Sequence, residues 1–206
     1  MELFEAIHGR RSVRKFRPDP VPEEVLHRVI DAARWAPSAG NLQSTEFIIV
    51  KDEQIKAQLV QAALGQAFIA QAPVVVVVCA DTQRSAMKYG ERGKILYSIQ
   101  DASAAVQTLL LAAHDVGLSA CWVGAFFEEK VSETLAVPPG VVPMAIVPIG
   151  YSDSEPLAPF RSDLTEIVHF EKYGNKKIMK PAGVPVVESG KSRRKKKPTI
   201  VDVFRT

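Results

Sequence analysis

The stretch Pro73-Val74-Val75-Val76-Val77-Val78-Cys79-Ala80 contains five consecutive valines and no charged residue. β-Branched side chains favour extended backbone, and an uninterrupted apolar run of this length fits a strand that is buried on both faces. Such a strand lies in the middle of a sheet that helices cover. The run therefore predicts a protein of mixed helices and strands, of the α/β or α+β class, with this strand at its centre.

Helices are predicted on both sides of the valine run, from apolar residues spaced three and four apart. Leu3, Phe4 and Ile7 share one face of a first helix, Glu2 to His8. Gly9 is expected to end this helix in the left-handed conformation. The other predicted helices are Pro22 to Ala36, Glu53 to Ala63, Lys94 to Val116 and Glu128 to Leu135.

The helix from Lys94 to Val116 is apolar on one face and rich in alanine on the other, and Gly117 closes it. We expect it to be buried on most sides, either in the core or against a partner subunit. Three further strands are predicted, and Pro143 and Pro148 are expected to break the last of them. These strands are Phe47 to Val50, Ala120 to Val123 and Val142 to Ile149.

Composition excludes several classes of protein. The chain has 206 residues, 47% hydrophobic and 24% charged, as expected for a folded globular protein. The longest apolar run, Ala72 to Ala80, is far shorter than the roughly 20 residues that a membrane-spanning helix needs. The first residues lack the pattern of a secretory signal, so we predict a cytoplasmic location. Cys79, Cys121 and the scattered histidines predict neither a disulfide framework nor a metal site.

The basic residues are concentrated at the C-terminal end. Residues 176–206 hold ten Lys and Arg against two acidic residues, whereas residues 1–175 are net acidic. We therefore predict a main domain over residues 1–174 and a basic extension over residues 175–206. The run Lys191 to Lys197 could bind polyanions such as nucleic acid, but a solubilising tail is the favoured interpretation.

The basic loop, Arg10 to Lys15, follows the first predicted helix and places four cations and a hydroxyl in six residues. Guanidinium groups and a neutral donor are the groups that bind a phosphate monoester. A solvated basic loop has the same composition, so the residues alone leave both interpretations open.

Two other segments have the composition of ligand-binding turns. In the polar turn, Pro37 to Gln43, the side chains of Ser38, Asn41 and Gln43 could pair with the edge of a polar heterocycle. In the glycine turn, Cys121 to Phe126, Gly124 would let a ligand approach backbone N–H groups. Ordinary turn chemistry explains both segments equally well.

The usual nucleotide and catalytic motifs are missing. No GxGxxG pattern follows a predicted strand, and Gly190-Lys191-Ser192 lacks the earlier glycine of a phosphate-binding P-loop. No nucleophile elbow is present, and His8 and His114 are interpreted as packing or surface residues. We therefore predict no catalytic side chain.

Taken in order, five motifs resemble the FMN-dependent nitroreductase family, over Met1 to about Tyr173. The motifs are RRSVRKF (Arg10 to Phe16), PSAGNLQ (Pro37 to Gln43), CWVGAF (Cys121 to Phe126), PIGY (Pro148 to Tyr151) and EIVHFEKYG (Glu166 to Gly174). The resemblance implies an α+β fold with a central, mostly antiparallel sheet flanked by helices. It also implies an intertwined homodimer with FMN at the subunit interface, in which the helix from Lys94 to Val116 is the central dimer helix.

The resemblance also implies roles for single residues. Arg10, Ser12 and Arg161 would bind the FMN phosphate, with Arg11 lining the same loop, and Arg14 would lie near the ribityl chain and the pyrimidine edge. Residues of the polar turn would reach the cofactor from the other subunit, and the glycine turn would offer a backbone N–H to flavin N5. The full predicted cofactor set is Arg10, Arg11, Ser12, Arg14, Pro37, Ser38, Gly40, Asn41, Gln43, Val123, Gly124, Ala125 and Arg161.

The implied activity is hydride transfer from NAD(P)H to FMN, followed by reduction of a nitroaromatic, quinone or similar acceptor, in a ping-pong order. FMN would carry the chemistry, so the protein would need no dedicated acid or base. Relatives with the same fold include dehalogenases and an enzyme that fragments the flavin, so these reactions are the alternatives.

The sequence departs from the family pattern near the substrate. Many members continue the Asn-x-Gln motif with Pro-Trp, but here Ser44, Thr45 and Glu46 follow Gln43, so an aromatic residue is missing. The segment Thr82 to Gly93 contributes to the substrate cover in relatives and here contains several cations. One of these cations could meet the pyrimidine ring, or the segment could be a solvated loop.

Overall fold

The computed structural model describes residues 1–177, so the run Lys191–Lys197 and most of the predicted basic extension lie outside the described part. The chain forms two compact units, Met1–Ala158 and a second that begins at Pro159. The second unit contains the short helix α8, Leu164–Ile167, whose first turn is capped by the Asp163 carboxylate. The domain boundary after Gly174 stays a prediction.

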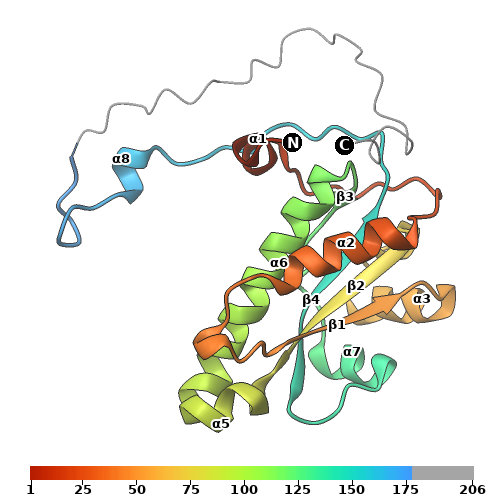
Figure 1. Ribbon diagram of the computed structural model, residues 1–206. Coiled ribbons are helices and arrows are strands. Elements are labelled where there is room, and N and C mark those ends of the chain that lie inside the picture. The colour runs from red at the N-terminus through yellow and green to blue at the C-terminus, as the bar shows by residue number, and fades with distance from the viewer. Residues whose placement is uncertain (178–206) are drawn as a thin grey trace, which may run out of the picture. The chain divides into compact units, whose positions relative to one another are not determined.

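The first unit is built on a four-stranded sheet in the order β1-β2-β4-β3. The strands are β1 Thr45–Val50, β2 Val74–Asp81, β3 Ser119–Ala120 and β4 Val141–Gly150. Every neighbouring pair is antiparallel. Figure 1 shows β1 along one edge of this sheet. The predicted antiparallel sheet flanked by helices is confirmed.

Strand β2 is buried on both faces, as the valine run predicts. Val74, Val76 and Val78 belong to one hydrophobic core, and Val75 and Val77 belong to the other. Successive side chains of a strand point to opposite faces, so one strand supplies both cores. The run of identical residues therefore places β2 inside a three-layer structure.

Helices cover both faces of the sheet (Figure 1). The helices α2, Glu23–Arg34, and α6, Ser98–Asp115, pack on one face. On the other face lie α3, Glu53–Ala62, α4, Phe68–Gln71, and α7, Glu128–Leu135. Helix α1, Leu3–Gly9, contacts α6 and leaves its predicted apolar face, with Leu3, Phe4 and Ile7, exposed.

The prediction that Pro143 and Pro148 break the last strand is wrong. Strand β4 is continuous, with Pro143 paired with Cys79 and Pro148 paired with Val75. A proline lacks only the backbone donor, and the Pro148 carbonyl still accepts a hydrogen bond from Cys121 N at 3.4 Å. The register shifts by one residue beside Pro143, which leaves Met144 as a β-bulge in this strand.

The segment that leads into α6 also differs from the prediction. Residues 82–92 form a helix, α5, Thr82–Arg92, and residues 93–97 form a π-helical turn, η2 Gly93–Tyr97, so α6 begins at Ser98 rather than Lys94. Gly90 has a φ of +56° and bends the chain there. A Cβ on Gly93 would lie 2.4 Å from the Ser85 carbonyl oxygen, so only glycine lets these turns pack together.

Two smaller predictions at α1 and β3 are also wrong. Gly9 is the last residue of α1 and is not left-handed; a Cβ there would lie 2.9 Å from His114 Nε2, so the glycine allows α1 to approach α6. The strand predicted over Ala120–Val123 is limited to β3, and Val123 forms a single bridge with Ile146. Gly117, with a φ of +80°, follows the end of α6 as predicted.

Within residues 1–177, none of the helices combines the length and the apolar character that crossing a membrane requires. The same residues contain no group of three or more His, Cys, Asp or Glu side chains that could hold a metal ion.

Candidate functional site

The basic loop lies directly beside β3 and the glycine turn. Val13 N donates a hydrogen bond to the Ala120 carbonyl at 3.1 Å, and Ser12 forms a parallel bridge with Ala120. An extended segment of this kind points alternate side chains to opposite sides. Two of the three predicted motifs, more than a hundred residues apart in sequence, therefore meet in one chain.

Arg11 turns back toward the end of α1. Its Nη1 donates to the carbonyl oxygens of His8 at 2.6 Å and of Arg10 at 2.9 Å. Its Nε is buried and has no hydrogen-bond partner among the described residues. Arg10 and Arg11 line a cavity of about 320 Å³, in which Glu155 is the one carboxylate side chain. The side chains that line the cavity therefore carry a net positive charge.

Arg14 extends toward the linker between α3 and α4. Its guanidinium lies over the Phe68 ring, 5.8 Å from the ring centroid. In the same linker, Gln66 Nε2 donates to the carbonyl oxygens of Ala63 and Ala125, each at 3.0 Å. The linker, the basic loop and the glycine turn thus form one corner of the molecule.

The glycine turn presents unused backbone donors at this corner. Val123 is buried, and its N–H is bonded to the Ile146 carbonyl at 2.9 Å. The N–H groups of Gly124 and Ala125, both exposed, make no backbone hydrogen bond among the described residues. Gly124 also has open space where a side chain would lie, since the nearest neighbour of a Cβ would be Trp122 Nε1 at 3.7 Å.

The two titratable groups at this corner are held in their neutral forms at neutral pH. Burial raises the pKa of the Cys121 thiol, and the nearby Arg14, Ser12 and Arg10 only partly oppose that rise. Burial also lowers the pKa of His114, and the charges of Arg10 and Arg11 lower it further, against the effect of Asp115. Neither group has the perturbation of an activated nucleophile or base.

The polar turn is held in an unusual backbone conformation. Gly40, Asn41 and Gln43 have φ values of +57°, +56° and +51°, a region that only glycine enters without strain. Ser38 Oγ accepts a hydrogen bond from Gln43 N at 3.0 Å. Two non-glycine residues of this kind in one turn, Asn41 and Gln43, point to a functional site.

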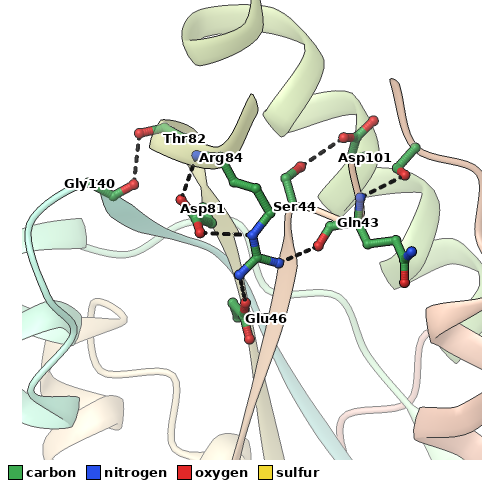
Figure 2. A network of polar contacts seen from close by, with 9 residues as sticks. Gln43, Ser44, Glu46, Asp81, Thr82, Arg84, Asp101 and Gly140 are labelled. Atoms are coloured by element: carbon green, nitrogen blue, oxygen red, sulfur yellow. Dashed lines mark hydrogen bonds and ion pairs between the residues drawn. The ribbon is translucent and has the colours of Figure 1, made fainter. Parts of the chain in front are cut away.

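A buried carboxylate fixes the polar turn to α6. Asp101, 5% exposed, accepts hydrogen bonds from Ala39 N at 2.9 Å and from Ser44 Oγ at 2.8 Å. Arg84 of α5 supports the end of the turn: its Nη1 donates to the Gln43 carbonyl at 2.6 Å, and it pairs with Glu46 and Asp81. Figure 2 shows Arg84 between these three partners.

The two regions lie toward opposite ends of α6. Asp101, in its first turn, holds the polar turn, whereas His114, in its last turn, lines the cavity at the basic loop. Thirteen residues of helix separate them, a rise of about 20 Å at 1.5 Å per residue. One chain therefore does not bring all three motifs together: the basic loop and the glycine turn meet, and the polar turn lies apart.

Comparison with known proteins identifies the architecture. The Nitroreductase family matches residues 7–69 and 62–151, which span all three motifs. The chain belongs to the nitroreductase family. An NADH dehydrogenase of Thermus thermophilus is 31% identical over 186 residues, covering 77% of this chain and 91% of that protein.

Two further similar proteins extend this comparison. An FMN reductase [NAD(P)H] of Bacillus subtilis is 29% identical and covers 84% of this chain and 75% of that protein. The structure of the NADPH:FMN oxidoreductase of Vibrio harveyi complexed with NAD⁺ aligns with a TM-score of 0.76 at 28% identity, over 82% of this chain and 77% of that chain.

The remaining predicted residue, Arg161, belongs to the second unit. Its Nη1 donates to the Phe160 carbonyl at 3.0 Å, and its side chain is exposed. Its role toward a phosphate stays a prediction.

Three residues that the sequence did not single out shape this nitroreductase site: Gln66, Phe68 and Asp101. Gln66 and Phe68 lie in a segment without a recognisable pattern. Asp101 could have been found from the sequence, because it is a carboxylate at a core-facing position of a largely apolar helix. Buried carboxylates are rare unless paired or hydrogen-bonded, so its burial could have been read as a structural anchor.

Proposed function

We propose that this nitroreductase family member is an FMN-dependent oxidoreductase that takes electrons from NAD(P)H and reduces nitroaromatics, quinones or similar acceptors. The observation that carries the proposal is the pairing of the basic loop with Ala120, directly before the glycine turn, in which the N–H groups of Gly124 and Ala125 make no backbone hydrogen bond among the described residues. The names of two relatives, an FMN reductase and an NADPH:FMN oxidoreductase, support FMN and a nicotinamide nucleotide as the ligands.

The residues at this corner fit FMN chemically. A phosphate dianion needs charged donors, and the basic loop supplies them: Arg10 and Arg11 line one cavity, and Ser12 follows them in the sequence. Arg14 with Phe68 offers a cation and an apolar ring for a heterocycle, and Gly124 and Ala125 offer backbone donors to a ring nitrogen.

When bound, FMN supplies the two-electron chemistry that links NAD(P)H to the acceptor. The chain binds and orients it. Arg14 would stabilise negative charge at the pyrimidine edge, and the backbone N–H groups of Gly124 and Ala125 would orient the central ring. We assign no side chain as general acid or base, because FMN itself would carry the two-electron chemistry and burial keeps the Cys121 thiol protonated at neutral pH.

We also propose that the active form is an intertwined homodimer in which the polar turn of one chain completes the site of the other. The separation of the two regions along α6 supports this arrangement, as does the outer edge of β1, which has no strand neighbour among the described residues. Leu3 and Phe4 of α1, 63% and 69% exposed, and Ile95 and Ile99 before and within α6, 63% and 42% exposed, offer apolar surface for the contact. A cytoplasmic location stays a prediction.

The first experiment is an absorbance spectrum of the purified protein from about 300 to 550 nm, before and after anaerobic addition of NADH or NADPH. We expect flavin bands that bleach with one or both nucleotides and return when a nitroaromatic or quinone is added. A protein without flavin, even after incubation with FMN, would contradict the proposal. Bound flavin that reduces none of these acceptors would favour dehalogenation or flavin fragmentation instead.

Shared sites are tested by mixing two variants, R10A and G40W, during refolding, and by assaying at an FMN concentration too low to load the weakened R10A site. A hybrid dimer then has one site built from the intact basic loop of one chain and the intact polar turn of the other. Random pairing gives about a quarter of the wild-type activity, because half of the dimers are hybrids with one intact site of two. If each site lay within one chain, the mixture would stay inactive.

A further inference from the structure

Two side chains of α5 end at the polar turn. A Cβ on Gly40 would lie 2.5 Å from Tyr89 Oη and 2.8 Å from Lys88 Nζ. Gly40 is therefore required for two reasons, its positive φ and the space that these groups occupy. Lys88 and Tyr89 consequently lie beside the segment that we assign to the cofactor of the partner chain.

The position of Tyr89 is fixed by its neighbours. Its ring packs edge-on against the Tyr97 ring, with centroids 5.1 Å apart and an angle of 87° between the planes. Tyr97 Oη accepts a hydrogen bond from Arg92 Nε at 2.9 Å. The close packing of Gly93 on Ser85 holds α5 against η2, so the tyrosine pair is part of a rigid turn rather than of a solvated loop.

Lys88, like Arg92 and unlike Arg84, has no carboxylate partner among residues 1–177. Arg84, one turn earlier, is neutralised by Glu46 and Asp81. Lys88 makes no ion pair within residues 1–177, and its ammonium lies over the Tyr89 ring, 5.4 Å from the centroid. Glu91, the one acidic residue inside α5, pairs with Lys94 at 3.7 Å. An uncompensated cation and a phenol hydroxyl therefore meet at this point.

The geometry points to Lys88 and Tyr89 as the binding site for an anionic group carried by a substrate at the flavin, an inference that rests on the proposed function. The group is a carboxylate on an aromatic acceptor or the 2′-phosphate of NADPH. The Lys88 ammonium supplies the charge, and the Tyr89 hydroxyl donates a hydrogen bond. The substrate cover of this chain thereby selects substrates by their charge. In many relatives, a tryptophan would select substrates by stacking on their rings.

The test compares substrates that differ only in charge, using FMN-loaded wild-type, K88Q and Y89F proteins. The acceptors are 4-nitrobenzoate and the neutral 4-nitrobenzamide; the reductants, measured with the neutral acceptor, are NADPH and NADH. A charged hydrogen bond at a partly exposed site is expected to change KM by about fivefold to tenfold. K51Q, which removes an exposed lysine paired with Glu23, is the matched control and should change neither ratio.

Binding is also measured without turnover, by calorimetric titration of 4-nitrobenzoate and 4-nitrobenzamide into the loaded proteins in the absence of reductant. A weaker affinity of K88Q for the anion alone assigns the site to the acceptor. A KM change for NADPH alone assigns it to the nucleotide phosphate. Either result supports the inference, and unchanged ratios in both K88Q and Y89F overturn it.

Failure of the proposed function gives a different pattern. Wild-type protein would then lack flavin or fail to reduce the neutral acceptor, whatever residue stands at position 88. If the wild-type protein still bound 4-nitrobenzoate and K88Q did not, the anion site would be supported and the proposed reaction would be contradicted.

Discussion

The basic loop and the polar turn lie toward opposite ends of α6 and are built on different principles. The basic loop has charged side chains and open donors, with a buried Arg11 Nε that no described group satisfies. The polar turn has its backbone held by Asp101 and Arg84, which bond Ala39 N and the Gln43 carbonyl, and it offers a fixed backbone shape. One region is suited to bind by charge, and the other is suited to bind by pre-organised geometry.

The largest effect is expected where the pre-organised region is anchored. D101A leaves Ala39 N and the buried Ser44 hydroxyl without their acceptor, which should lower the free energy of unfolding by about 2–4 kcal/mol. Urea denaturation measures this change. D115A, on the same helix but exposed, is the control and should cost far less. Equal losses in both variants would show that Asp101 does not anchor the turn.

The charge-based region is tested by R10A. Loss of a charged hydrogen bond to phosphate, about 1.5–3 kcal/mol, should weaken FMN binding by about 10- to 100-fold with little change in stability. Fluorescence titration of the apoprotein with FMN measures the affinity. Removal of the exposed Arg28 on α2 is the control for charge alone. The contrast between the two regions would be contradicted if R10A lowered the free energy of unfolding as much as D101A while the affinity for FMN stayed unchanged.

A third prediction concerns Gly40 and separates the cost of its left-handed backbone from the cost of a steric contact with Tyr89. G40A should cost about 1–2 kcal/mol of stability from the left-handed backbone, and more because the new methyl group meets Tyr89 Oη. In a Y89A background the contact with Tyr89 disappears and only the contact with the flexible Lys88 side chain is left, so the two substitutions should show a coupling energy above about 0.5 kcal/mol. Strict additivity would mean that Tyr89 does not occupy that space.

The smallest effect is a pH dependence at the basic loop. The folded-state pKa of His114 is lowered from 6.5, chiefly by burial and then by Arg10 and Arg11. Below about pH 6.5 the unfolded chain therefore binds a proton that the folded chain does not, and stability falls as the pH drops through this range.

Urea denaturation between about pH 5 and 8 tests this prediction. H114Q should flatten the decline relative to wild type. A steeper decline in H114Q would reverse the sign of the predicted linkage.

The sequence was most informative where one residue type repeats. Five valines located β2 and both of its cores, and regular apolar spacing located α2, α3 and α7. Prediction from the sequence failed where tertiary packing overrides the local pattern of residues. Helix α5 is polar and bent at Gly90, and its place is set by an N-cap and by contact with η2, none of which leaves a periodic signal.

The candidate site shows the same division. The motifs and their residue types could be read from the sequence, and the meeting of the basic loop with the glycine turn agrees with them. The side chains that hold the polar turn in place could not be predicted from the sequence. Asp101 lies 62 residues from Ala39, and Arg84 lies 41 residues from Gln43. Which distant side chain satisfies a turn depends on helix placement, and no local pattern encodes that.

Strand β1 ends the sheet, and along its outer edge the backbone N–H and C=O groups have no strand partner among the described residues. Such an edge is a template for another chain, and Ile49 on this strand is 41% exposed. The final step of refolding should therefore be bimolecular, with a half-time that shortens as protein concentration rises. The lifetime of newly made protein would then depend on its own abundance, because a dilute chain keeps this edge open to proteases and to aggregation for longer.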